Sequence, residues 1–317
     1  MRRRDFIKQT GKAVAFAAVT GGTGFVFHNR QTVRAGAPVL ARPDFRAPVD
    51  QNFPAVALNR DPDHVAALRK TLDAVGGIKR FVRPGERVTL KPNVGWDRTA
   101  AQAANTNPIL VAEMVRQCLE AGASGVIVTD VTCNDPRRCF IRSGIRDEAE
   151  RAGAAVLLPT DDDYVEIDMG GELLTRWPVL KHFVECDRLI NMPIVKQHSL
   201  SRCTIGMKNL YGIIGGRRNQ LHQRIDQSIV DLAAFATPTL TVVDATRVLL
   251  RGGPQGGSLD DVALEHTVIC ATDPVAADSR GAEFLGVTGE SVGHIVLAQQ
   301  SGLGLLDYNA AGYKEII

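Results

Sequence analysis

The chain has 317 residues, of which 44% are hydrophobic, so it can bury the core of one large or two modest globular domains. Its formal net charge is +2, but the first 35 residues contain seven lysines and arginines against one acidic residue. The rest of the chain therefore has 30 basic and 34 acidic side chains. A slightly acidic body without clustered basic and aromatic residues argues against a nucleic-acid-binding function.

The N-terminus has the features of a twin-arginine (Tat) export signal. Residues 2–8 read RRRDFIK, and an almost uncharged stretch rich in Ala, Gly and Val follows from Ala13 to Phe27. This stretch is too short and too rich in glycine to span a bilayer comfortably, so we expect cleavage before Gly36; an uncleaved anchor is the alternative. The expected location is the periplasm, with the Tat translocase as a partner during export and no stable membrane span after cleavage.

After this signal, the sequence predicts a linker at residues 36–53 and an α/β domain at 54–317. Residues 36–53 are rich in Pro, Arg and Ala and show no periodicity. In the domain, continuous apolar runs alternate with segments of helical periodicity, which favours a mostly parallel or mixed sheet flanked by helices, as one domain or as two lobes. We predict strands at 54–59, 87–91, 125–130, 155–158, 188–194, 239–244 and 267–272. We predict helices at 63–75, 108–121, 142–152, 226–236 and 274–285.

Polar residues follow three of the predicted strands. Lys91-Pro92-Asn93 comes at the end of the first long strand, and Asp130 and Asp244 end two later ones. In open α/β sheets, ligands bind beyond the carboxyl ends of the strands, so these residues outline one candidate rim. An aspartate at a strand end is also a common turn or helix cap, which is the structural alternative.

The strongest local signal is the segment from Lys196 to Arg224, which contains no acidic residue in a chain whose body is net acidic. It includes the glycine-rich run Gly212–Gly216, followed by Arg217 and Arg218. Glycines allow the backbone to approach an anion closely, and arginines bind carboxylate or phosphate in a bidentate manner, so this segment predicts an anion site. The run is not a Walker motif, and a solvated basic face is the alternative.

Two histidines in this segment, His198 and His222, are candidates for general acid–base chemistry or for metal ligation. Asp130, Asp244 or Asp226 would then supply oxygen ligands or orient an imidazole. No diagnostic metal spacing is present, so a divalent metal is left open. We interpret the acidic run at 161–163 as a solvated turn, and the glycine-rich run at 252–257 as either a mobile lid or a turn.

The six cysteines are scattered, with no C-x-x-C pair and no ferredoxin-like run, so an iron–sulfur cluster within this chain is not expected. Cys133 and Cys139 are the only close pair and could form a disulfide in an oxidising periplasm. Buried thiols are the alternative.

Several separated segments resemble the family called domain of unknown function 362 (DUF362) over roughly residues 54–290. They are Lys91-Pro92-Asn93, Thr106-Asn107-Pro108, Asp130, residues 191–198 (NMPIVKQH), Thr204 with residues 208–212 (KNLYG), and Asp273-Pro274-Val275-Ala276 with Asp278. Many members of that family carry an appended ferredoxin-like domain, and this sequence departs from them because it contains no such cysteine array. The resemblance implies no reaction. It implies that the site residues are Lys91, Asn93, Asp130, Lys196, His198, Lys208 and Asn209.

The first functional hypothesis is an enzyme that acts on a small anionic molecule, a carboxylate or a phosphate. His198, Lys196 and Asp130 would be catalytic. The anion would be bound by Lys91, Asn93, Lys208, Asn209, Arg217 and Arg218. The second hypothesis is a non-enzymatic carrier or maturation partner of an exported redox system, holding a metal or cofactor at Asp130, Asp244 or His222.

Overall fold

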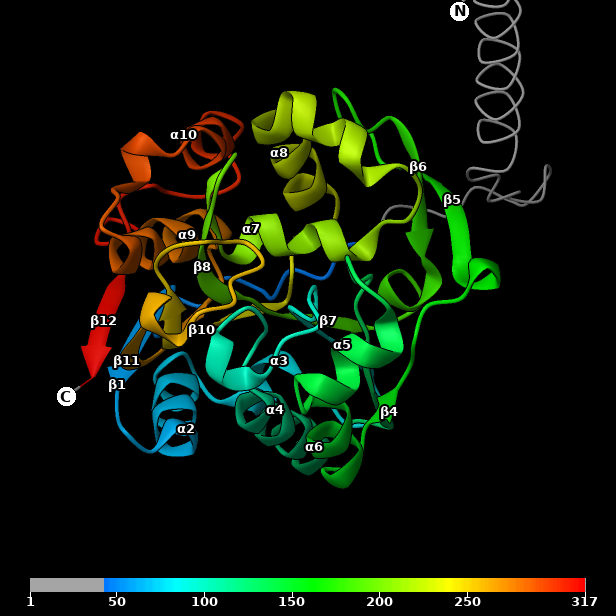
Figure 1. The fold of residues 1–317 in the computed structure, drawn as a ribbon. Coiled ribbons are helices and arrows are strands. Elements are labelled where there is room, and N and C mark those ends of the chain that lie inside the picture. Colours follow the sequence, from blue (N-terminus) through cyan, green and yellow to red (C-terminus); the bar gives the residue numbers. More distant parts are fainter. Residues whose placement is uncertain (1–42, 317) are drawn as a thin grey trace, which may run out of the picture. The chain divides into compact units, whose positions relative to one another are not determined.

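A ten-stranded mixed sheet with the strand order β12-β1-β11-β10-β7-β2-β3-β4 forms the centre of the domain, and β8 and β9 extend it from β10 (Figure 1). The computed structural model describes residues 43–316; the predicted Tat signal at 1–35 and the start of the predicted linker lie outside them. The strands are β1 (Val56–Arg60), β2 (Arg87–Pro92), β3 (Gly125–Val128), β4 (Ala155–Val156), β7 (Arg188–Met192), β8 (Ile194–His198), β9 (Arg202–Thr204), β10 (Leu240–Leu249), β11 (Val262–Ala271) and β12 (Tyr313–Ile316). A separate antiparallel hairpin consists of β5 (Tyr164–Asp168) and β6 (Arg176–Leu180).

Helices cover both faces of the sheet. The α-helices are α2 (His64–Ala74), α3 (Ile78–Phe81), α4 (Pro108–Glu120), α5 (Pro136–Arg142), α6 (Ile145–Arg151), α7 (Gly206–Asn209), α8 (Ile225–Phe235), α9 (Pro274–Ala282) and α10 (Gly293–Gln300). Figure 1 shows α2, α4 and α6 on one side and α7, α8, α9 and α10 on the other. One hydrophobic core lies on each side, and the α/β class with a mostly parallel, helix-flanked sheet is confirmed.

The alternation of side chains along β2 and β7 positions the site. Val88 and Leu90 of β2 pack into the core beneath α2 and α4. Because successive side chains of a strand point to opposite faces, Lys91 faces the α7 side. Lys91 is in register with Asn191 of β7, so the parallel pairing brings these two polar side chains together under α7.

Several predicted elements differ in extent from the structure; β10 and β11, for instance, are each 10 residues long and extend beyond the strands predicted at 239–244 and 267–272. The helix predicted at 142–152 is wrong at its start, because α5 ends at Arg142 and Gly144, with φ +77°, separates it from α6. The strand predicted at 188–194 is two strands, β7 and β8, with Pro193 between them. The strand predicted at 125–130 ends at Val128, so that Asp130 lies in the loop beyond it.

The described residues, 43–316, belong to one compact unit rather than two lobes. Within the described part of the chain, none of the helices combines the length and the apolar character needed to cross a bilayer.

Candidate functional site

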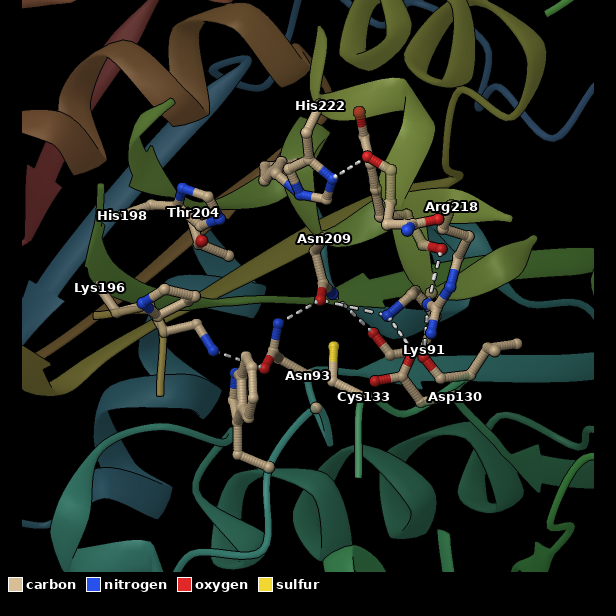
Figure 2. A pocket seen from close by; sticks show the side chains of 18 of the residues that line it. Lys91, Asn93, Asp130, Cys133, Lys196, His198, Thr204, Asn209, Arg218 and His222 are labelled. Atoms are coloured by element: carbon tan, nitrogen blue, oxygen red, sulfur yellow. Dashed lines mark hydrogen bonds and ion pairs between the residues drawn. The ribbon is translucent and has the colours of Figure 1, made fainter. Parts of the chain in front are cut away.

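A cavity of about 500 Å³ lies beyond the carboxyl ends of β2 and β3, between these strand ends, β8 and the segment from α7 to His222. It brings together every site residue proposed from the sequence except Arg217, Asp226 and Asp244. Figure 2 shows His198 and His222 on one side of this pocket and Asn93, Lys91 and Asp130 on the other. The predicted residues that line it are Lys91, Asn93, Asp130, Lys196, His198, Lys208, Asn209, Arg218 and His222.

The floor of the cavity is a buried ion pair between Lys91 and Asp130. The Lys91 Nζ atom lies 2.6 Å from Asp130 Oδ1, and both side chains are almost completely buried. Lys91 also donates to the carbonyl of Pro92 and to Asn209 Oδ1, so its three N–H groups are all used. Asp130 Oδ2 accepts the backbone N–H of Val94 at 2.7 Å. Burial lowers the pKa of Lys91 and raises the pKa of Asp130, but the ion pair opposes both shifts and these hydrogen bonds hold the charged forms.

A chain of side-chain hydrogen bonds runs from this ion pair across the cavity. Asn209 Oδ1 accepts from Lys91 and from Asn93 Nδ2, while Asn209 Nδ2 donates to Asn191 Oδ1 and to the carbonyl of Lys91. Asn93 Oδ1 in turn accepts from Lys196 Nζ at 2.9 Å. Asn209 thus has all its hydrogen-bonding groups engaged, and its role in this network is to connect α7 to β2 and β7.

Two further lysines reach the cavity without a carboxylate partner. Lys196 Nζ donates to Asn93 Oδ1 and to the carbonyl of Ala104, which leaves one N–H. Lys208 Nζ lies 3.5 Å from the centre of the Tyr211 ring. Within residues 43–316, neither ammonium forms an ion pair, and burial lowers the pKa of each lysine to about 7.

His198 is held in one tautomer. Its Nδ1 accepts the backbone N–H groups of Leu200 (3.1 Å) and Ser201 (3.3 Å), in the turn between β8 and β9. The ring proton is therefore on Nε2. Burial lowers the pKa of His198 to about 3, and Lys208 and Lys196 contribute to this shift, so the ring is a neutral hydrogen-bond donor.

His222 has the complementary tautomer. Its Nδ1 lies 3.1 Å from the carbonyl of Asn219, which can only accept, so Nδ1 has the proton and Nε2 is an acceptor. The rings of His198 and His222 are nearly parallel, with an interplanar angle of 9° and centroids 6.3 Å apart. Burial lowers the pKa of His222, and the nearby charge of Lys208 lowers it further.

The basic glycine-rich segment is held by packing on both sides. Gly212 has no room for a side chain, since a Cβ there would lie 1.8 Å from Asp130 Oδ1. The N–H of Gly215 donates to the carbonyl of Pro178, and Trp177 donates to the carbonyl of Gly215, so the β5–β6 hairpin holds this loop. Arg218 donates to the carbonyls of Val131, Tyr211 and Thr132, whereas Arg217 is exposed and does not line the cavity.

Sequence analysis did not propose several residues of the cavity wall, among them Trp96, Ser199 and Asn219, and it named Pro254 only as part of the run 252–257. Pro254 belongs to the loop at 252–257, which docks on β8 because Gly253 N–H donates to Gln197 Oε1. A Cβ at Gly253 would lie 1.8 Å from the carbonyl oxygen of Gln197, so glycine is required for this approach. Trp96 follows the strand-end residue Asn93 by three positions, and this closeness was the signal that could have indicated it.

Asp244 lies outside the cavity lining. It is buried, and its two oxygens accept from the backbone of Asn107 and from the backbone and hydroxyl of Thr246, the structural role of a turn and cap residue. In the part of the chain that the structure describes, no three His, Cys, Asp or Glu side chains are arranged to hold a metal ion. Asp130, Asp244 and His222 therefore do not converge on one point.

The remaining motifs have structural placements. The acidic run is a short 3₁₀ helix (Asp161–Asp163), and Asp163 pairs with Lys181 at 2.8 Å. Cys133 and Cys139 are free thiols rather than a disulfide; Cys133 lines the cavity, whereas Cys139 is buried in α5.

Comparison with known proteins gives a family but no reaction. The model of the domain of unknown function DUF362 matches residues 88–283. A thylakoid-associated protein from Synechocystis sp. is 28% identical over 63% of this chain and 64% of its own length. The apoprotein of lactate racemase from Thermoanaerobacterium thermosaccharolyticum aligns over 72% of this chain and 56% of that one, with 11% identity and a TM-score of 0.41. A protein from Thermotoga maritima aligns over 75% and 58%, with 14% identity and a TM-score of 0.38.

We predict that the Lys91–Asp130 pair stabilises the fold only as a pair. Asp130→Asn leaves a buried ammonium without a counter-charge, so it should lower the free energy of unfolding by about 3–5 kcal/mol. Adding Lys91→Met to that variant should recover a large part of this loss, because no buried charge is then left unpaired. Urea unfolding of the two single variants and the double variant measures the coupling. Strictly additive losses would contradict a coupled pair.

Proposed function

Since the chain belongs to the DUF362 family, whose name assigns no reaction, we propose its function from the cavity: an enzyme that binds a small carboxylate or phosphate and transfers a proton. The observation that carries this proposal is the excess of buried positive charge. Lys91, Lys196, Lys208 and Arg218 line the cavity against one carboxylate, Asp130. Burying an ammonium without a counter-charge is costly, and an anion in the cavity would supply that charge.

The contacts favour Lys196 and Lys208 as the groups that bind the anion. Lys91 has no N–H left, and Arg218 is largely occupied by backbone carbonyls. Lys196 retains one N–H and Lys208 all three, and Asn93 Nδ2 retains one more donor. Lys91, Asp130 and Asn209 then serve as the support that aims these donors.

The two histidines supply a donor and an acceptor to the bound molecule. His198 offers Nε2–H, which can stabilise negative charge that develops on a substrate oxygen. His222 offers the lone pair of Nε2 as a proton acceptor. The charge of Lys208 lowers the pKa of His222, so an anion that compensates this charge raises it again and makes His222 a better base in the complex.

We also propose that the protein works in the periplasm after export by the Tat route, on the basis of residues 2–8 and the apolar stretch that follows. The alternative function, a metal or cofactor carrier, has less support, because Asp244 lies outside the cavity that Asp130 and His222 line, and no three candidate ligands are grouped among the described residues.

We predict that the cavity binds small dianions and that affinity falls as pH rises. An anion raises the pKa of Lys196 and Lys208 above the value of about 7 in the free protein. The two lysines therefore make their full contribution to anion affinity below about pH 7, and this contribution is lost as pH rises through their higher pKa in the complex. Titration calorimetry with oxalate and with sulfate, whose charges are constant from about pH 6 to pH 9, measures this dependence.

Lys208→Met and Lys196→Met should each weaken oxalate binding at least tenfold, since a charge-assisted hydrogen bond contributes about 1.5–3 kcal/mol. Lys79→Met, the same change at an exposed lysine of α3, should leave the affinity unchanged. Arg217→Gln tests the residue that the sequence analysis also proposed and should have little effect, because its side chain does not line the cavity. Equal affinities in all four variants would contradict the site.

For catalysis, we predict that the wild-type protein promotes exchange of substrate hydrogen with solvent deuterium. Mixtures of small carboxylic acids and phosphate esters, incubated in D₂O and followed by NMR, provide the assay. His222→Gln should abolish the exchange, and His198→Ala should reduce it at least a hundredfold, while both variants still bind oxalate. Oxalate binding without exchange in any mixture would indicate a binding protein instead of an enzyme.

For export, the double change Arg3→Lys and Arg4→Lys should retain the full chain in the cytoplasm of a bacterium that has a Tat system. Fractionation and immunoblotting compare it with the wild-type chain, and a Lys12→Arg variant is the control for a charge-conserving change nearby. Equal periplasmic amounts of wild type and double variant would refute the Tat route.

A further inference from the structure

Behind the cavity, Asp278 of α9 holds the beginning of α7. Its carboxylate is completely buried and accepts the backbone N–H groups of Gly206 at 2.6 Å and Met207 at 3.1 Å. A Cβ at Gly206 would lie 2.7 Å from Asp278 Oδ1, so glycine permits this close approach. Lys208 follows directly in the same turn, which makes its position in the cavity dependent on Asp278.

Next to Asp278 lies a histidine that the described residues leave without a hydrogen bond. His294, at the start of α10, is completely buried, and neither ring nitrogen has a hydrogen-bond partner in residues 43–316. Its Nε2 lies 3.9 Å from Asp278 Oδ2, and its Nδ1 lies 3.7 Å from Asp226 Oδ1 on α8. A buried imidazole with two unsatisfied nitrogens is costly, so its position between two carboxylates requires a reason.

The charged groups around His294 come from three different helices. Asp226 of α8 favours a proton on the ring, Lys208 of α7 disfavours it, and burial lowers the pKa of His294. Asp278 of α9 faces Nε2. Burial raises the pKa of Asp278 to about 7, and Asp273 at the start of α9 contributes to this shift. Asp278 Oδ2 and His294 Nε2 are thus two adjacent groups, 3.9 Å apart, that can each hold a proton.

On the basis of the anion site proposed above, we propose that Asp278 and His294 are positioning residues that share one proton and hold Lys208 in the cavity through α7. With the proton on His294, Asp278 is a carboxylate that accepts both N–H groups of α7. With the proton on Asp278 Oδ2, that oxygen is a weaker acceptor for Met207. The transfer breaks the Oδ2–H bond, forms the Nε2–H bond and needs no other reactant.

Anion binding and this proton are then linked. Lys208 repels a proton on His294, and a bound anion compensates the charge of Lys208. Binding therefore moves the proton from Asp278 to His294, strengthens the hydrogen bonds to α7 and fixes Lys208 against the anion. Because linkage is reciprocal, a variant that cannot accept this proton must bind the anion more weakly.

Oxalate titrations between about pH 6 and pH 9 on wild type, His294→Phe and Lys208→Met test this proposal. Phenylalanine keeps a ring in the space and removes both nitrogens. At pH 6, below the pKa of about 7 for Asp278, the His294→Phe protein should bind oxalate about tenfold more weakly, because Asp278 keeps its proton. At pH 8.5 its affinity should approach that of wild type, and its thermal unfolding midpoint should be unchanged or higher.

A purely structural histidine predicts something different. An affinity equal to wild type at every pH, or lower by the same factor at every pH, would overturn the shared proton. His294→Gln provides the same comparison with a smaller side chain if the phenylalanine variant does not fold. Asp278→Asn should weaken binding at all pH values, and adding His294→Phe to it should cause no further loss.

The outcomes separate the two proposals. Wild-type protein that binds no oxalate contradicts the anion site and this inference with it. Wild-type binding that is lost in Lys208→Met but unaltered in His294→Phe at each pH supports the anion site and contradicts the shared proton alone.

Discussion

The buried ion pair between Lys91 and Asp130 is the interaction on which the candidate site depends. It joins the ends of two parallel strands, and through Asn209 it attaches α7 to the sheet. Asn93 continues the same network to Lys196 on β8. Each side chain of this network forms a hydrogen bond with the next one. The network therefore holds the N–H donors that face the cavity in place and leaves some of them free to bind a ligand. An unsatisfied buried ion pair would destabilise the fold, so the full set of partners around Lys91, Asp130 and Asn209 is what allows a charged site at this depth.

The general position of the site could be predicted from the sequence because it follows from chain geometry. Parallel strands end at the same edge of a sheet, so Asn93 and Asp130, which follow two such strands, had to lie near each other. The acid-free run from Lys196 to Arg224 indicated where positive charge gathers. The α/β class followed from alternating periodicities. The sequence analysis did not predict the short elements β5, β6, β9, β12, α3, α5, α7 and α10, and some predicted ends were wrong, for example where Gly144 and Pro193 interrupt otherwise continuous patterns.

The roles within the site could not be predicted, because they depend on which donors are already engaged. Lys91 and Lys208 look alike in sequence, yet one has three acceptors around it and the other only an aromatic ring. Arg217 and Arg218 are adjacent, yet only the second turns toward the cavity. The tautomers of His198 and His222 are set by backbone groups of a turn and of a 3₁₀ helix. Such partners come from tertiary structure, which no local pattern encodes.

The glycines of this region show how the fold separates packing from binding. Asp278 lies close to Gly206, Asp130 lies close to Gly212, and the backbone of β8 lies close to Gly253. In each case the neighbouring atoms leave no room for a Cβ atom at the glycine. Two of these three approaches involve a carboxylate: Asp130 pairs with Lys91 in the cavity floor, and Asp278 holds the beginning of α7 behind the cavity. Both carboxylates are thereby engaged in support, while Lys196 and Lys208 reach the cavity without a carboxylate partner among the described residues. The anion site that we propose would therefore discriminate by charge before shape, since a cation or a neutral molecule would leave Lys196 and Lys208 uncompensated.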